Sequence, residues 1–175
     1  EGVDANPMRI GFVDVLRRMG ADIEIEERGE RLGEPVADLV VRAAPLSGTD
    51  IAGDEIPGVI DELPVLAVAA AFAAGTTRIS GAGELRAKES DRISTVATEL
   101  VRFGAAVEQR PDGLVVGPGE LHPGAFVSHG DHRVALAAAT GSLGLPGTST
   151  VSGWGAAAVS YPGFLDDVAR LQAAA

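Results

Sequence analysis

The sequence predicts a mixed α/β (α+β) domain in which buried helices pack together and sheets lie outside them. The first observation is an internal repeat, because the run GTTRISG at 75–81 returns as GTSTVSG at 147–153. The second is that residues 63–74 and 134–139 are apolar on every side, which is typical of buried helices. Repeated units that each carry one such helix favour three-fold packing around those helices.

The N-terminal part is expected to form one helix and two strands. The pair Asn6–Pro7 is typical of a helix start, and Gly20 is typical of a helix end. Residues 44–57 contain two prolines and two glycines, which predicts a loop with at most a short strand. The expected strands are residues 21–26 and 36–42, with a charged turn over 26–34.

The middle of the chain contains the complete repeat unit. Asp61 is expected to cap a buried helix that has Pro64 in its first turn and ends at Gly75. A second helix is expected from Lys88 to Phe103, because apolar residues recur from Ile93 at i, i+3, i+4, i+7 and i+8. A strand and a hairpin complete the unit, at residues 76–80, 105–109 and 114–116.

The C-terminal part repeats this order. Asp131 is expected to cap the apolar helix at 134–139, a strand is expected at 148–152, and an amphipathic helix at 161–171. The expected domain organisation is the end of one unit, one complete unit and most of a third, at about 1–57, 58–127 and 128–175.

Composition limits the class of protein. A chain of 175 residues with 46% hydrophobic residues is long enough to bury one core. Its formal net charge of -11 argues against a nucleic-acid partner. No apolar run reaches the roughly 18 residues of a membrane span, and no secretory signal is recognised. The absence of cysteine fits a reducing cytoplasm, where we expect the protein to work.

The stretch from Glu84 to Arg92 contains the only lysine of the chain. Extending the helix stripe backwards by four residues places Glu89, Arg92 and Lys88 on or beside a core-facing line, where charges need partners or a ligand. The alternative is a solvated first turn with a Glu89–Arg92 ion pair, which would contribute only a few tenths of a kcal/mol. Basic side chains could still form a local positive pocket on an acidic protein, namely Arg86, Lys88, Arg92 and Arg133.

Helix starts provide a second argument for an anion site. If the units are three-fold related, the starts expected at Asp61, Lys88 and Asp131 point the same way, and their free N–H groups attract anions. Simpler interpretations stay open: Asp61 and Asp131 as plain caps, and Arg133 paired with Asp131. His132 could equally be a satisfied core histidine. The other two histidines are expected on the surface without matching partners, and no zinc site is expected.

Three runs resemble signatures of the 5-enolpyruvylshikimate-3-phosphate synthase family. They are IDELP at 60–64, RAKESDRI at 86–93 and GDHRVALA at 130–137. The resemblance implies a domain of three βαβαββ units, as in the enolpyruvyl transferases. It also implies that this chain is the C-terminal portion of such an enzyme, without its other domain.

The resemblance also implies residue roles in the transfer of an enolpyruvyl group. Asp61 and Glu89 would be catalytic, and Lys88 and Asp61 would contact shikimate 3-phosphate. Arg92 and Arg133 would bind phosphoenolpyruvate, and His132 would neighbour the site. Neither a metal nor a cofactor is implied. A lysine that some members carry before the last helix is replaced here by the run VSYP at 159–162, and Glu84 stands where some have asparagine.

Two other functions stay open at this level. A related transferase that acts on UDP-N-acetylglucosamine shares the fold, although the KESDR run at 88–92 favours the shikimate enzyme. A non-catalytic repeat domain used as a binding module is the alternative from another class.

Overall fold

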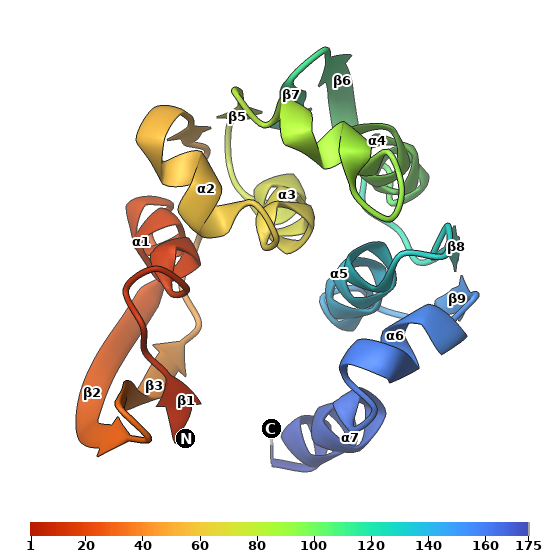
Figure 1. Cartoon of the computed structure of the whole chain (residues 1–175). Coiled ribbons are helices and arrows are strands. Elements are labelled where there is room, and N and C mark those ends of the chain that lie inside the picture. Colours follow the sequence, from red (N-terminus) through yellow and green to blue (C-terminus); the bar gives the residue numbers. More distant parts are fainter. Residues whose placement is uncertain (175) are drawn as a thin grey trace.

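The computed structural model describes residues 1–174. In Figure 1 the chain follows an arc from β1 to α7, and α3 and α5 lie on its inner side. None of the described helices is long and apolar enough to cross a membrane. The elements are, in order, β1 Val3–Asp4, α1 Gly11–Arg18, β2 Asp22–Arg31, β3 Glu34–Arg42, β4 Asp50–Ile51, η1 Gly53–Glu55, α2 Ile56–Val59, α3 Leu63–Phe72, β5 Thr77–Ile79, η2 Gly83–Ala87, α4 Arg92–Arg102, β6 Ala106–Arg110, β7 Gly113–Gly117, β8 Ala125–Val127, α5 His132–Leu143, β9 Thr150–Ser152, α6 Gly155–Ser160 and α7 Phe164–Ala174.

The first part is the antiparallel sheet β1-β3-β2 with α1. The charged turn expected at 26–34 is wrong, because β2 continues to Arg31 and pairs with β3 along its length. Charges on the exposed face pair across or along these strands, as in the contact of Arg28 Nε with Asp38 Oδ2 at 2.7 Å. The helix expected from Pro7 begins later, because the Asn6 side chain accepts a hydrogen bond from Met8 N and forms a turn instead.

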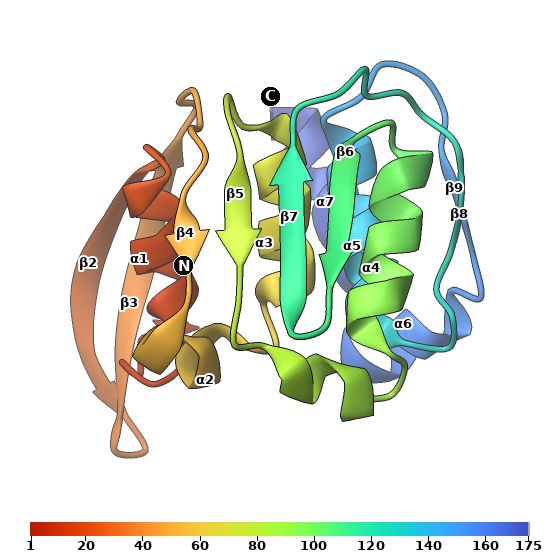
Figure 2. The same cartoon turned by 90° about the horizontal axis from the view of Figure 1, so that it is seen from above.

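The middle part is a four-stranded sheet in the order β4-β5-β7-β6 (Figure 2), in which only β4 and β5 are parallel. The expected hairpin of β6 and β7 is confirmed. The loop expected at 44–57 is wrong in part, because residues 53–59 form η1 and the short helix α2. Pro57 lies in the first turn of α2, where a missing N–H is tolerated.

The last part pairs β8 with β9 in parallel, and α5 connects the two strands. The apolar helix expected at 134–139 is confirmed but longer, since α5 runs from His132 to Leu143. The helix expected at 161–171 begins only at Phe164, and the separate helix α6 precedes it. No distinct signal in the sequence predicts α6, which has only six residues.

Two helix ends show the repeat in the backbone. After α1, Gly20 N donates to Arg17 O and the next N–H donates to Leu16 O; after α4, Gly104 N and its successor make the same two bonds. Both glycines have a left-handed backbone, with φ of 103° and 91°. A Cβ on Gly104 would lie 2.1 Å from Glu120 O, so a side chain does not fit there. The unit boundaries at 57 and 127 stay a prediction.

The core lies between α3, α4 and α5 and the inner face of the four-stranded sheet. Large apolar side chains in this core include Leu63 and Leu66 from α3 and Ile93 and Leu100 from α4, each at most 1% exposed. Burying such a side chain contributes about 1.5–3 kcal/mol. This packing brings the N-terminal ends of the three helices together.

Candidate functional site

The candidate site lies where α3, α4 and α5 begin. The expected helix start at Lys88 is wrong: residues 83–87 form the 3-10 helix η2, and α4 begins at Arg92. Asp91 stops any earlier start, because its Oδ1 accepts a hydrogen bond from Ser94 N at 3.1 Å and caps the helix. Lys88 and Glu89 therefore lie in the loop before α4 and not on its core-facing stripe.

Arg92 is the centre of the cluster and is only 1% exposed. Its Nε donates to Asp131 Oδ2 at 2.8 Å, its Nη1 to Asp61 Oδ1 at 3.2 Å and its Nη2 to Glu89 Oε2 at 2.5 Å. The Glu89–Arg92 ion pair is present as the simpler interpretation requires, but its arginine is buried and not solvated. One guanidinium thus joins carboxylates from three separate segments.

Asp131 is the fully buried member, with 0% exposure. Its cap of α5 is confirmed, because Oδ1 accepts a hydrogen bond from Arg133 N at 2.9 Å. Burial alone would raise the pKa of Asp131. The hydrogen bond and charge of Arg92, together with the hydroxyl of Ser90 and the N–H of Arg133, outweigh burial and lower it. Asp131 is therefore an ionised anchor inside the protein.

Asp61 differs from Asp131 although both were expected as caps. It lies in the turn between α2 and α3, and Glu62 occupies the N-cap position without a capping side-chain bond. The cap interpretation of Asp61 is therefore wrong. Its side chain is 36% exposed and contacts Arg92 Nη1 and, at 3.6 Å, Arg133 Nη2. A carboxylate with an open face can reach a ligand.

Arg133 extends from the first turn of α5 toward α3. Its Nη1 donates to Glu62 Oε1 at 3.0 Å, so the alternative interpretation of a side-chain pair with Asp131 is wrong. The side chain is 31% exposed. Sequence reasoning did not single out Glu62, and the only available signal was its place beside Asp61 in the 60–64 run.

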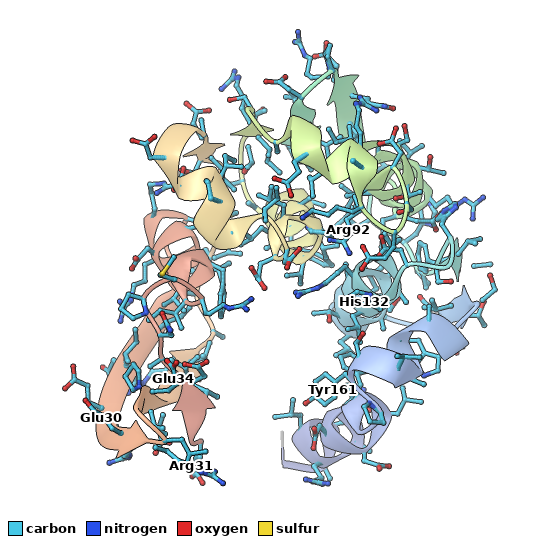
Figure 3. The ribbon with its side chains drawn as sticks, in the orientation of Figure 1. Glu30, Arg31, Glu34, Arg92, His132 and Tyr161 are labelled. Carbon is cyan, nitrogen blue, oxygen red and sulfur yellow. The ribbon has the colours of Figure 1, made fainter. Side chains whose placement is uncertain are left out.

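His132 lies beside the cluster at the start of α5, near Arg92 (Figure 3). Its Nδ1 is 3.7 Å from Glu89 Oε1, and its side chain is 23% exposed. Lys88 is turned elsewhere, since its Nζ donates to Glu84 Oε1 at 2.6 Å. Asp61, Glu89, Arg92, Arg133 and His132 are therefore joined by contacts, whereas Lys88 is engaged by Glu84.

The cluster is not the positive pocket that Arg86, Lys88, Arg92 and Arg133 could have formed. The cluster holds four carboxylates against two guanidinium groups, because Glu62 and Asp131 join the two expected acids. Arg86 is absent from it and pairs instead with Asp91, at 2.7 Å, and with carbonyl oxygens of the β6–β7 turn. An anionic ligand would need further positive charge from outside these residues.

One histidine outside the cluster has a partner that was not expected. His129 Nε2 is 2.7 Å from Glu99 Oε1, and the Glu99 carboxylate is buried within α4. Its other oxygen accepts a hydrogen bond from Val127 N at 3.0 Å. Glu99 thus holds the loop before α5 against α4. Among residues 1–174, no group of three or more histidine or acidic side chains has the geometry of a metal site.

This fold is that of the enolpyruvyl transferases. The crystal structure of the enolpyruvyl transferase NikO from Streptomyces tendae matches 93% of this chain and 35% of its own chain, with a TM-score of 0.65 at 22% identity. At that identity the likeness shows the fold alone.

Comparison of the sequence with known proteins identifies one family among the enolpyruvyl transferases. A model of EPSP synthase (3-phosphoshikimate 1-carboxyvinyltransferase) matches residues 1–168, and the chain belongs to this family. The 3-phosphoshikimate 1-carboxyvinyltransferase of Gloeobacter violaceus is 54% identical over 172 residues, which are 98% of this chain and 40% of that protein. The one from Synechococcus sp. (strain JA-3-3Ab) is 52% identical and is covered to 39%.

A solved structure agrees with this assignment. The EPSP synthase of Acinetobacter baumannii matches 96% of this chain with a TM-score of 0.90 at 38% identity, and 40% of its own chain is covered. This chain therefore spans about 40% of the length of the relatives it matches.

Proposed function

We propose that this chain is the C-terminal portion of an enzyme that transfers the enolpyruvyl group of phosphoenolpyruvate to a hydroxyl of shikimate 3-phosphate and releases phosphate. Family membership supports the reaction. The observation that carries the residue roles is that Arg92 holds Asp61 and Glu89 through one guanidinium. Two carboxylates from distant segments are thereby fixed in one place.

The reaction requires both a proton acceptor and a proton donor. In the addition step the hydroxyl oxygen bonds to C2 of phosphoenolpyruvate, Asp61 takes the hydroxyl proton, and Glu89 gives a proton to the methylene carbon. In the elimination step Glu89 takes a proton back from the new methyl group, the double bond re-forms as the bond from C2 to the phosphate oxygen breaks, and Asp61 returns its proton to the departing phosphate. Asp61 and Glu89 suit these steps because their side chains are 36% and 47% exposed.

The arginines are proposed to bind phosphoenolpyruvate, since a guanidinium fork matches a carboxylate or phosphate. Arg133 can bind phosphoenolpyruvate directly, because its side chain is partly exposed. Arg92 is buried among carboxylates, so its principal task is to hold the acids, and its contact with substrate requires one of them to shift. Lys88 is proposed to contact shikimate 3-phosphate after release from Glu84.

The missing part of the enzyme is the proposed partner. It must bring positive charge and exclude water, because the cluster here has an excess of carboxylates. Closure of the two parts would orient both substrates. We place the enzyme in the cytoplasm, a prediction that cell fractionation would check.

The test is a graft in which this chain replaces the matching part of the Gloeobacter violaceus relative. The grafted protein is expected to release phosphate from phosphoenolpyruvate only when shikimate 3-phosphate is present. The isolated 175-residue chain is expected to bind phosphoenolpyruvate weakly and to release no phosphate. A correctly folded graft without turnover would contradict the proposed function and favour a binding module, and turnover by the isolated chain would contradict the division of the site.

A further inference from the structure

Glu62 is a partly exposed carboxylate of the cluster that has no part in the proposed reaction. It lies in the 60–64 run, directly after Asp61, and its side chain is 25% exposed. Within residues 1–174 its carboxylate has a single hydrogen-bonded side-chain partner, the Nη1 of Arg133 at 3.0 Å. A charged pair of this kind between two helix starts needs an explanation beyond the folding of either helix.

The backbone around Glu62 is rigid. Glu62 N donates to Val59 O and Glu62 O accepts from Leu66 N, both at 2.9 Å, so the residue is tied to α2 and to α3. Leu63, which follows, is 1% exposed and packed in the core. The carboxylate of Glu62 therefore extends from a fixed point toward α5, which packs along α3.

Arg133 is fixed at its backbone but has a long side chain. Its N–H is held by Asp131 Oδ1 at 2.9 Å, while its side chain is 31% exposed. A free arginine side chain loses rotamer entropy when it binds a ligand. Nη1 of the Arg133 guanidinium donates a hydrogen bond to Glu62, and Asp61 Oδ2 lies 3.6 Å from Nη2. Donors that Glu62 does not use stay available for an anion.

We propose that Glu62 is a positioning residue that holds the guanidinium of Arg133 in the orientation that binds the carboxylate or phosphate of phosphoenolpyruvate. This inference rests on the proposed function. A guanidinium held at one edge by an acceptor loses less freedom when its other donors bind a ligand, so affinity is gained without a direct contact. The essential feature is the acceptor oxygen of Glu62, not its negative charge, which by itself repels the ligand.

Two substitutions separate these contributions. Glu62→Ala removes the acceptor oxygen, whereas Glu62→Gln keeps an acceptor of the same reach and removes the charge. In the grafted enzyme, Glu62→Ala is expected to raise KM for phosphoenolpyruvate about tenfold, the scale of one hydrogen bond to a charged group, and to change kcat less than about threefold. Glu62→Gln is expected to restore KM to within about threefold of the parent.

The matched control is Glu55→Ala. Glu55 has a comparable exposure of 30% and holds Arg18 Nη2 through both oxygens, at 3.0 and 2.9 Å. Arg18 lies on α1 and is not part of the cluster. Glu55 Oε1 also accepts a hydrogen bond from Ala52 N at 2.9 Å. The variant is expected to leave KM and kcat unchanged, and so reports on the general loss of a partly exposed carboxylate and its contacts.

An unchanged or lower KM in Glu62→Ala would overturn the proposal, because Glu62 would then compete with the ligand. An equal rise in KM for phosphoenolpyruvate in Glu62→Gln and Glu62→Ala would also overturn it. If the graft has no turnover, the proposed function fails. An NMR titration of the labelled 175-residue chain with phosphoenolpyruvate then still tests whether Glu62 orients Arg133. The Arg133 Nε–H signal is expected to shift with phosphoenolpyruvate in the parent and in Glu62→Gln, whereas Glu62→Ala should need about tenfold more phosphoenolpyruvate for half of the shift. Equal concentrations at half shift would overturn the proposal.

Discussion

Asp61 and Asp131 precede the two buried helices of neighbouring repeat units, yet their surroundings are opposite. Asp131 caps α5, has no exposed surface and receives hydrogen bonds from Ser90, Arg92 and Arg133. Asp61 caps nothing, is 36% exposed and is held through Arg92 Nη1 alone among donors within hydrogen-bond distance. These statements cover residues 1–174.

The difference shows that one position of the predicted repeat can be buried as part of the structure in one unit and stay open to a ligand in the next. A carboxylate that exchanges protons with a substrate needs an open face within hydrogen-bond reach. Asp131 has none, because its oxygens are fully engaged inside the protein. Asp61 keeps an open face because Glu62, one residue later, is the N-cap residue of α3. The shared arginine links the two carboxylates, so the buried one supports the open one.

The largest change is expected when a proposed catalytic carboxylate is replaced. In the grafted enzyme, Asp61→Asn and Glu89→Gln should each lower turnover by roughly two to four orders of magnitude, the usual scale for a positioned acid or base. Both swaps nearly keep the shape, so the free energy of unfolding should change little. Steady-state phosphate release and urea unfolding measure the two quantities. Normal turnover in either variant would contradict its catalytic role.

The second effect concerns the contribution of the buried carboxylate, Asp131, to the free energy of unfolding. Asp131→Asn removes one charge of a buried pair and leaves Arg92 with less compensation, so the free energy of unfolding should fall by about 3–5 kcal/mol. Urea unfolding of the 175-residue chain measures this loss. Asp61→Asn in the same chain is the matched control and should lose about 1 kcal/mol or less, because its pair is partly solvated. Equal losses would remove the proposed difference.

A third, smaller effect is the pH dependence of that stability. The pKa of Asp131 is lower in the folded protein than the value of about 3.9 in an unfolded chain. The unfolded state therefore binds a proton more readily, and the stabilisation is complete above pH of about 4–5 and is lost as pH falls further. The difference in unfolding free energy between the parent and Asp131→Asn should shrink in that acid range. A difference independent of pH down to about 3 would contradict the assignment.

The sequence predicted the long apolar elements well, because a run such as 63–74 can be accommodated in only one way, as a buried helix. The glycines after α1 and α4 and the β6–β7 hairpin were likewise local signals. Short elements were missed, since α2 and α6 have four and six residues and owe their existence to packing. Only the first half of β2 was predicted as a strand, and its second half was predicted as a turn because the charged residues there hide the alternation that marks a strand.

The sequence predicted most members of the cluster, but it missed Glu62, it included Lys88, and it did not predict the pairing. The three motif runs supplied the residues that contact each other, whereas no spacing could show that Arg92 is buried or that Arg133 turns to Glu62. Pairing depends on how helices from different units pack, and sequence periodicity carries no information about that. The start of α4 was misplaced for a local reason, since Asp91 competes as a cap with the longer helical pattern.

Replacing Asp91 is expected to have the smallest effect on the free energy of unfolding. It separates the contribution of helix capping from that of burial at Asp131. It caps α4 through Ser94 N as Asp131 caps α5, but its side chain is 39% exposed and its ion pair with Arg86 is partly solvated. Asp91→Ala should therefore cost about 1 kcal/mol of unfolding free energy, the usual value of a helix cap, with little added by the ion pair. Urea unfolding beside Asp131→Asn measures the ratio of the two losses. A loss of about 3–5 kcal/mol for Asp91→Ala would mean that capping alone accounts for Asp131, and burial beside Arg92 would then need no separate role.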